Sequence, residues 1–267
     1  MAKLLSLGTL GGAETFAGEA TKTLRARHPE FAEPIYFPSM EDCWDALQAD
    51  KIEVLLLGSE RTGQPHHGRP VVENGWFVLD EVTQPLGCNL YVKPGTERKN
   101  IKRITGHGST HQCVGWLERE FPGIPHDLHR LNSLAAGREA LAGDCTTAVV
   151  GTKSLRNALP EMELIATDID AGALSSWWAM SKTPAYAERP GHLVISGRFD
   201  REGGLGRLVA AIAATGFHLH TTAAFPVPEG AAGVYDYLVA FSGSGKLADV
   251  QRVVNAAPGT RLVGAFA

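Results

Sequence analysis

The chain has 267 residues and a formal net charge of −4, which argues against a nucleic-acid-binding protein or a membrane-surface protein. Its length exceeds the usual size of one domain, so the core needs neither a metal ion nor a disulfide to fold. We expect a cytoplasmic protein, because no charged-then-apolar leader precedes Leu4 and no apolar run reaches the roughly 18 residues of a membrane span. The four widely spaced cysteines predict free thiols: Cys43, Cys88, Cys113 and Cys145.

The first third of the chain alternates strand and helix patterns. A strand at Leu4–Leu7 is followed by a glycine-rich loop, and a helix begins near Thr15. Ile35–Phe37 is a second strand, and Ser39 is expected to cap the next helix because acidic residues fill its first turn. Val54–Leu57 is a third strand. This order predicts an α/β body.

The alternation continues through the middle of the chain. We expect parallel sheets with helices on both faces, and ligands at the carboxyl ends of the strands. Trp177 and Trp178 are expected to be core residues. The further strands are Leu90–Val92, Ile101–Thr105 and Thr147–Val150, and the further helices are His111–Glu120 and Leu134–Ala142.

Three polar loops follow predicted strands: Gly8–Thr15, Gly58–Gly63 and Gly106–Gln112. One such loop alone fits ordinary turn chemistry, but three at equivalent strand ends favour a shared cleft. His107 and His111 are candidate acid–base residues of the third loop, whereas the adjacent pair His66-His67 is typical of an exposed loop and not of a metal site. The candidate ligand-binding residues are Gly11, Gly12, Ser59, Glu60, Arg61, Ser109, Thr110 and His111.

Residues 191–267 carry the pattern of a βαββαβ module of the ferredoxin-like kind. A boundary is expected at Thr183–Pro190, where prolines and charges interrupt the apolar pattern. A glycine-rich loop, Asp200–Gly206, feeds the first helix of the module. The predicted elements are the strands Leu193–Ile195, Phe217–Thr221, Tyr235–Phe241 and Leu262–Phe266, and the helices Leu205–Ile212 and Leu247–Asn255.

The order of several short phrases resembles the prephenate dehydratase family. Thr15-Phe16 follows the first strand, Gln112-Cys113 precedes Trp116-Leu117 on a helix, and Asn132–Ala136 opens another helix. The resemblance implies a two-lobed α/β body like a type II periplasmic binding protein over residues 1–185, with the second lobe at roughly 85–165. It also implies that residues 191–267 form an ACT domain.

The resemblance further implies a lyase that converts prephenate to phenylpyruvate, with loss of water and CO2, in phenylalanine biosynthesis. No metal ion or organic cofactor is expected. Ser176 takes the place of the family's catalytic threonine and Thr15 belongs to its first motif, so both are the expected catalytic residues. Trp177 stands where the family has an arginine, and Arg61 is a new arginine in the second loop. An amino-acid effector is expected at Gly203, Gly204 and Leu205.

These departures leave three interpretations open. The first is a prephenate dehydratase, and the second is a decarboxylase or other lyase acting on a related cyclic carboxylic acid. The third is a non-catalytic sensor of a carboxylate or an amino acid. In each case the partner is a small molecule and not a nucleic acid or a membrane. Because ACT modules pair, we expect a homodimer or homotetramer.

Overall fold

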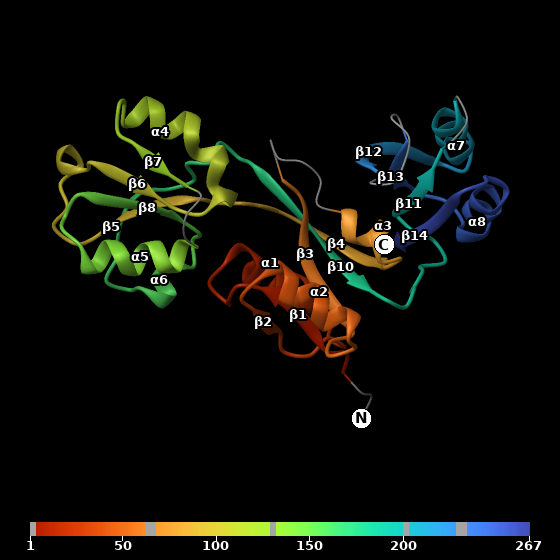
Figure 1. Cartoon of the computed structure of the whole chain (residues 1–267), viewed down its shortest axis with the longest axis horizontal. Coiled ribbons are helices and arrows are strands. Elements are labelled where there is room, and N and C mark those ends of the chain that lie inside the picture. Colours follow the sequence, from red (N-terminus) through yellow and green to blue (C-terminus); the bar gives the residue numbers. More distant parts are fainter. Residues whose placement is uncertain (1–3, 62–67, 129–131, 200–202, 228–233) are drawn as a thin grey trace.

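The computed structural model describes residues 4–61, 68–128, 132–199, 203–227 and 234–267. Figure 1 shows three regions in a row: a second lobe on the left, a first lobe in the centre and a C-terminal module on the right. Two long strands run from the first lobe towards the second. Within the described residues, no helix is both long and apolar enough to cross a membrane.

The first lobe is built on part of a nine-stranded sheet with the order β12-β13-β11-β14-β4-β10-β3-β1-β2. Five of these strands belong to the lobe, and three helices accompany them. The strands are β1 (Leu7–Leu10), β2 (Ile35–Phe37), β3 (Val54–Arg61), β4 (Phe77–Pro85) and β10 (Leu174–Ser181), and the helices are α1 (Phe16–Arg27), α2 (Met40–Gln48) and α3 (Arg69–Glu73).

The second lobe has its own five-stranded sheet with the order β7-β6-β8-β5-β9. Its strands are β5 (Asn89–Val92), β6 (Arg103–Thr105), β7 (His126–Asp127), β8 (Thr147–Gly151) and β9 (Glu163–Ala166). Its helices are α4 (Val114–Glu120), α5 (Ser133–Ala142), α6 (Leu155–Ala158) and the 3-10 turns η1 (Arg98–Asn100) and η2 (Gly108–Cys113).

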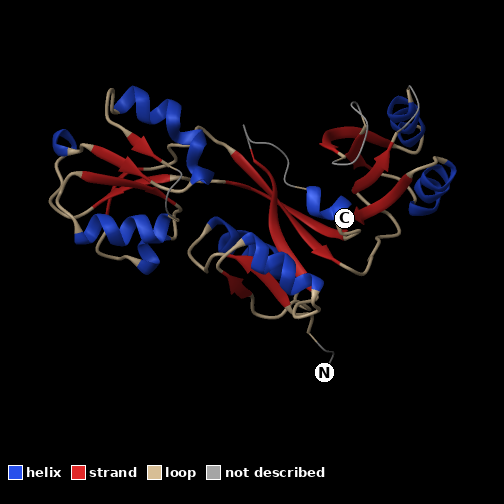
Figure 2. Ribbon diagram, in the orientation of Figure 1, coloured by secondary structure: helices blue, strands red, loops and turns tan. Residues whose placement is uncertain are grey.

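The C-terminal module has the predicted order βαββαβ, and its strand order β12-β13-β11-β14 is that of a ferredoxin-like sheet. Figure 2 shows both of its helices on the side away from the first lobe. Its elements are β11 (His192–Arg198), α7 (Gly204–Ala213), β12 (Phe217–Pro226), β13 (Tyr235–Gly243), α8 (Leu247–Ala256) and β14 (Thr260–Phe266).

The module is not a separate attachment, because its sheet continues into the body. Gly264 of β14 pairs in parallel with Val78 of β4, and a side chain at Gly264 would meet the Val78 carbonyl oxygen at 3.0 Å. Val194, Leu238 and Val263 of the module share one apolar core with the first lobe. The sequence pattern did not predict this union, since no local signal marks a single pairing between strands so distant along the chain.

The expectation of parallel sheets is wrong for both lobes. β10 runs antiparallel to both β3 and β4, and β5 runs antiparallel to β8 and β9. The physical reason is that β4 carries the chain out of the first lobe and β10 brings it back, so the two neighbours must point in opposite directions. The β1–β2 and β1–β3 pairs and the pairs of β6 with β7 and β8 follow the parallel pattern.

Several predicted boundaries shift in ways that matter for the site. The first strand is Leu7–Leu10 and not Leu4–Leu7, so the loop after it begins at Gly11. β3 continues through Arg61 because β10 pairs with it along that stretch, and the predicted loop at Gly58 is therefore strand. The capping role of Ser39 is confirmed, since its Oγ accepts a hydrogen bond from the Asp42 N–H at 3.1 Å.

Two short segments, 86–88 and 167–173, cross between the lobes side by side. The Leu86 N–H donates to the Ala173 carbonyl at 2.9 Å, and the Ile169 N–H donates to the Cys88 carbonyl at 2.8 Å. The buried carboxylate of Asp170 accepts from the N–H groups of Cys88 at 2.9 Å and Gly87 at 3.3 Å. Asp170 therefore ties the outgoing segment to the returning one.

Replacing Asp170 with alanine removes the acceptor of two buried N–H groups. We expect the free energy of unfolding to fall by about 3 kcal/mol, because hydrogen bonds to a charged acceptor are lost and their donors stay buried. Urea denaturation measures this change. Asp168→Asn is the matched control: Asp168 forms an exposed ion pair with Lys153, so its loss costs less than about 1 kcal/mol. Equal effects of the two substitutions would contradict this account of the crossing.

Candidate functional site

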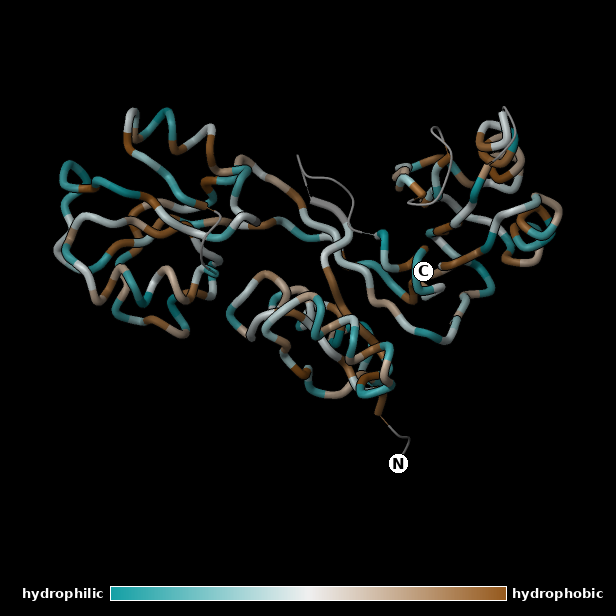
Figure 3. Tube along the Cα trace, viewed as in Figure 1, coloured by the Kyte–Doolittle hydropathy of each residue, from teal (hydrophilic) through white to brown (hydrophobic). Residues whose placement is uncertain are grey.

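The two faces of the first lobe lead to different parts of the molecule. On one face, Phe16 and Ala17 of α1 pack in a core that also includes Trp177 of β10 and Ile104 of the second lobe. On the other face, the residues beneath α2 share a core with the module. Figure 3 shows apolar residues along the central strands that separate these faces. The shared cleft expected from the sequence would therefore lie on the α1 face, which we call the cleft face.

The loop that begins α1 lies on this side of the sheet and is built around Thr15. The Thr15 Oγ1 accepts from the Gly18 N–H at 3.2 Å and donates to the Gly12 carbonyl at 2.7 Å. Gly11 has φ +90, and a side chain there would meet the Thr15 side chain at 3.0 Å. The structure thus brings together the predicted residues Gly11, Gly12 and Thr15, with the Thr15 hydroxyl engaged as a helix cap.

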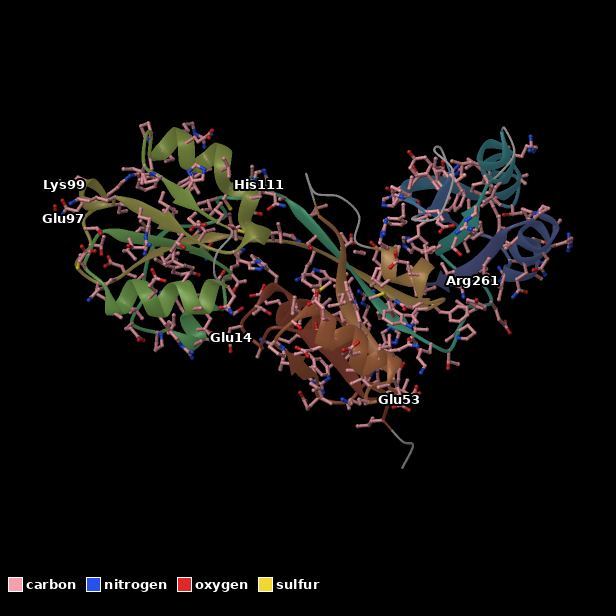
Figure 4. All side chains as sticks on the ribbon, viewed as in Figure 1. Glu14, Glu53, Glu97, Lys99, His111 and Arg261 are labelled. Atoms are coloured by element: carbon pink, nitrogen blue, oxygen red, sulfur yellow. The ribbon has the colours of Figure 1, made fainter. Side chains whose placement is uncertain are left out.

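The same loop contacts the second lobe. Thr152 Oγ1 donates to the Glu14 carbonyl at 3.0 Å, and the Ser154 hydroxyl donates to the carboxylate of Glu19 in the first turn of α1. Figure 4 shows Glu14 where this loop approaches the second lobe. The Glu14 Oε2 atom is buried and has no hydrogen-bond partner in the described structure. Thr152 and Ser154 were not among the predicted site residues, although they follow β8 as the other candidate loops follow their strands.

An irregularity in β3 places a serine at the cleft side of the sheet. Trp177 pairs with Gly58 and Ser176 pairs with Glu60, so Ser59 is the extra residue of a β-bulge. In such a bulge two residues face one partner, which sets Ser59 beside Gly58 on the side of Trp177. Ser59 is 3% exposed, and no described group hydrogen-bonds its Oγ. A buried hydroxyl of this kind is a candidate to bind a polar group of a ligand.

The two serines of β10 point to opposite faces of the sheet. Trp177 faces α1, so the strand's alternation puts Ser175 on the α1 face and Ser176 on the other. The pairing of Ser175 with Gln84 supports this assignment, since the Gln84 Oε1 accepts from Thr23 Oγ1 of α1 at 3.3 Å. Ser176 instead lies 2.7 Å from the Thr83 hydroxyl. Ser175 is 1% exposed and was not among the predicted site residues.

Trp177 is a core residue at 5% exposure, as expected, and Trp178 is buried on the opposite face. The Trp177 ring packs against Gly58, where an added Cβ would lie 3.7 Å from it. The indole therefore fills the place at which the resemblance has an arginine. Arg61 stands opposite Ser175 in the ladder, but the side chains of Arg61, Glu60 and Ser109 and the pair His66-His67 lie outside the described residues.

The third candidate loop belongs to the second lobe. Thr110 is fully buried, and its Oγ1 donates to the His107 carbonyl at 2.6 Å. Gly106 permits this tight turn, because a side chain there would meet the Val150 carbonyl at 3.0 Å. His107 and His111 are exposed, and Figure 4 shows His111 at the end of the second lobe that faces the first. Thr110 thus shapes the loop, and His111 is the accessible polar side chain.

The predicted effector loop of the module begins α7. Gly203 has φ +73 and provides no side-chain cap, Gly204 opens the helix, and Leu205 packs beside the module core. A groove of about 490 Å³ lies between α7 and α8 next to this loop. Its lining residues are Phe199, Gly204, Arg207, Leu208, Ala211, Val253, Ala256, Ala257 and Pro258.

Solved structures share this architecture over almost the whole chain. A prephenate dehydratase from Arthrobacter aurescens in complex with L-Phe has a TM-score of 0.79 at 21% identity, with 98% of this chain and 90% of that chain covered. The prephenate dehydratase from Staphylococcus aureus has a TM-score of 0.75 at 14% identity, covering 98% and 100%. GqqA, described as a novel type of quorum quenching acylase, has a TM-score of 0.75 at 16% identity, covering 98% and 97%.

At these identities the similarity shows the fold alone. No curated protein sequence matches the chain. The family model described as prephenate dehydratase matches residues 7–176, which is more than half of the 267 residues. The matched stretch contains the loop at Thr15, the bulge at Ser59, the whole second lobe and the first residues of β10. The chain is therefore a member of the prephenate dehydratase family.

Proposed function

We propose that the protein is a lyase that converts prephenate to phenylpyruvate with loss of water and CO2. The observation that supports this proposal is the family match across both lobes, together with the hydroxyl groups of Ser59 and Ser175 on the cleft face. Family membership and fold alone do not fix the activity, because sites and not folds carry chemistry.

The reaction defines what the cleft must supply. Prephenate loses a ring hydroxyl and a carboxylate, and the gain of aromaticity drives the step. The enzyme holds two carboxylates and donates a hydrogen bond to the departing hydroxyl. Positioning lowers the barrier by on the order of 7 kcal/mol in favourable cases, and a donor at the leaving oxygen adds about 3–4 kcal/mol.

We assign the hydroxyl donor to Ser175. It lies on the α1 face with Trp177, whereas Ser176 lies on the face that leads to the module. The resemblance selected Ser176 by its place beside Trp177, and that assignment stays a prediction that the same experiment tests. We assign one substrate carboxylate to Arg61, the residue opposite Ser175. We assign the other to the N–H groups between Gly11 and Thr15, because the N–H groups of Gly11 and Thr15 themselves donate to the carbonyls of Phe37 and Gly12.

A decarboxylase that retains the ring hydroxyl is the second candidate. The observation that favours it is Trp177, a buried side chain at the position where the family has an arginine. Without that arginine, the site has one cation fewer to pair with the two carboxylates of the substrate. Ser176 and Thr83 already hydrogen-bond each other, so neither hydroxyl is poised towards α1. This alternative needs no donor at a leaving oxygen.

An ultraviolet assay of the purified protein with prephenate separates these functions. Appearance of phenylpyruvate supports the dehydratase. Consumption of prephenate with a non-aromatic product replaces it with the decarboxylase. Binding of carboxylic acids without consumption of any makes the two lobes a sensor, and the catalytic assignments then fail.

We further propose that residues 191–267 form an ACT domain that binds an amino acid near Gly203, Gly204 and Leu205. Modules of this kind pair with a second copy, so we expect a dimer or tetramer. Sedimentation at micromolar concentration measures the mass in solution, and a monomer would contradict the paired-module proposal.

A further inference from the structure

One strand links the C-terminal module to the candidate site. In the nine-stranded sheet, β4 lies between β14 of the module and β10, which carries Ser175 and Ser176. The module thus touches the strand that sits directly beside the proposed donor. The start of β4 is at Phe77, and its far end leads into the crossing between the lobes.

Arg261 of β14 holds the start of β4. Its guanidinium donates to the carbonyl of Gly75 at 2.8 Å, to that of Trp76 at 3.2 Å and to that of Val71 at 3.5 Å. It also lies 4.9 Å from the centre of the Phe77 ring. Figure 4 shows Arg261 at the junction between the module and the first lobe. One side chain therefore joins the end of α3 and the start of β4 to the module.

The surroundings of Arg261 make this junction stiff. Burial lowers the pKa of its guanidinium, so its N–H groups depend on the three carbonyls in place of water. Tyr186 packs edge-on against Phe77, and its hydroxyl donates to the Leu262 carbonyl at 2.8 Å. Gly75 adopts φ +68, which presents its carbonyl to Arg261 without a side chain in the way.

α3 makes a second link to the same module. Arg69 donates to the Pro226 carbonyl at the end of β12 at 3.3 Å and lies 5.8 Å from the Phe225 ring. The Arg261 contacts at the other end of α3 and the Arg69 contacts at its start hold the helix between β12 and β14. A shift of these two strands relative to each other would therefore move α3 and β4 together.

The far end of β4 contacts the site. Thr83 lies six positions beyond Phe77, a span of about 20 Å along an extended strand. At that end Thr83 pairs with Ser176, Gln84 pairs with Ser175 and Val82 pairs with Trp177. β4 is paired with β10 from Phe77 to Pro85, and a packed sheet is not freely deformable, so a displacement at its start reaches its far end.

We propose that Arg261 is a positioning residue through which the C-terminal module sets the place of β4 and of the β10 serines beside it. The role needs no contact between Arg261 and substrate. It gives the module a physical route to the cleft through backbone carbonyls and one shared strand. The proposed lyase activity supplies one readout, and hydrogen exchange supplies another that does not depend on any activity.

Hydrogen–deuterium exchange of the full-length protein is the first test, with Arg261→Met, Arg261→Lys and the wild type. In the methionine variant we expect the amides at the far end of β4 and at the start of β10 to exchange roughly tenfold faster, as for loss of hydrogen bonds to a charged group. Arg261→Lys retains the positive charge and part of the hydrogen-bond donors, so its exchange rates should lie between those of the wild type and those of Arg261→Met.

Arg252→Met is the control, since Arg252 is an exposed arginine of α8 that pairs with Asp249 of the same helix. It should leave exchange in β4 and β10 unchanged. Faster exchange of Arg261→Met confined to α3 and β14 would overturn the proposal. Faster exchange everywhere, including β1 and β2, would overturn it as well, because it would mean general destabilisation.

Kinetics with prephenate is the second test and rests on the proposed function. We expect Arg261→Met to lower kcat by up to about 100-fold through misplacement of the donor, with KM changed less than about twofold. A raised KM with unchanged kcat would contradict the positioning role. If the wild type consumes no prephenate, the proposed function fails, while the exchange experiment still decides the role of Arg261.

Discussion

Ser175→Ala should lower phenylpyruvate formation at least about 100-fold, the usual cost of removing a hydrogen-bond donor to a transition state. The expectation follows from the face of β10 on which Ser175 lies. It is almost fully buried on the side of α1 and Trp177, which is the face where we place the cleft. Steady-state kinetics should show the loss in kcat and kcat/KM alike, because the donor acts on the leaving group and not on substrate capture.

Ser176→Ala is the matched control, one residue along the same strand. Its hydroxyl is paired with Thr83 on the opposite face, so its loss should change kcat less than about threefold, as for one partly exposed neutral hydrogen bond. Urea denaturation of both variants separates catalytic from structural effects. If Ser176→Ala loses activity and Ser175→Ala retains it, Ser176 is the donor, as the resemblance implies, and the assignment of the donor to Ser175 is wrong.

The contrast between these two serines shows where sequence reasoning stops. Local signals served well where chemistry is local: Ser39 caps α2 as predicted, and Asn132 caps α5 where a helix was expected. The face to which a strand residue points, in contrast, changes with every residue along the strand. The bulge at Ser59 also shifts the register of β3 against β10. The sequence carries no marker of that bulge, so Ser175 remained hidden beside Ser176.

Contacts between residues far apart in the sequence account for the other features that were not predicted. The βαββαβ order of the module follows from periodicity and turn residues, and the structure has it. The single pairing of Gly264 with Val78 and the contacts of Arg261 with Gly75 join segments nearly 190 residues apart, and neither leaves a periodic pattern. The same holds for Asp170, whose role depends on two N–H groups more than 80 residues earlier.

Arg61→Ala is the second substitution with a large expected effect. Arg61 ends β3 opposite Ser175, and a dianionic substrate needs a cation in a site where Trp177 fills the place of an arginine. Removing the cation that pairs with a substrate carboxylate should weaken substrate capture by about 2–5 kcal/mol. The loss should appear in KM and in the dissociation constant of a carboxylate inhibitor measured by calorimetry.

Two further substitutions serve as comparisons for Arg61→Ala. Arg61→Lys keeps the positive charge but not the planar fork that binds a carboxylate through two parallel hydrogen bonds, so it should recover only part of the affinity. Arg119→Ala removes an arginine of α4 whose side chain is 65% exposed and should leave affinity unchanged. Wild-type affinity and turnover in Arg61→Ala would make Arg61 a solvated residue at the end of β3. The substrate carboxylates would then be held by backbone N–H groups alone, and the start of α1 between Gly11 and Thr15 is the candidate source of these groups.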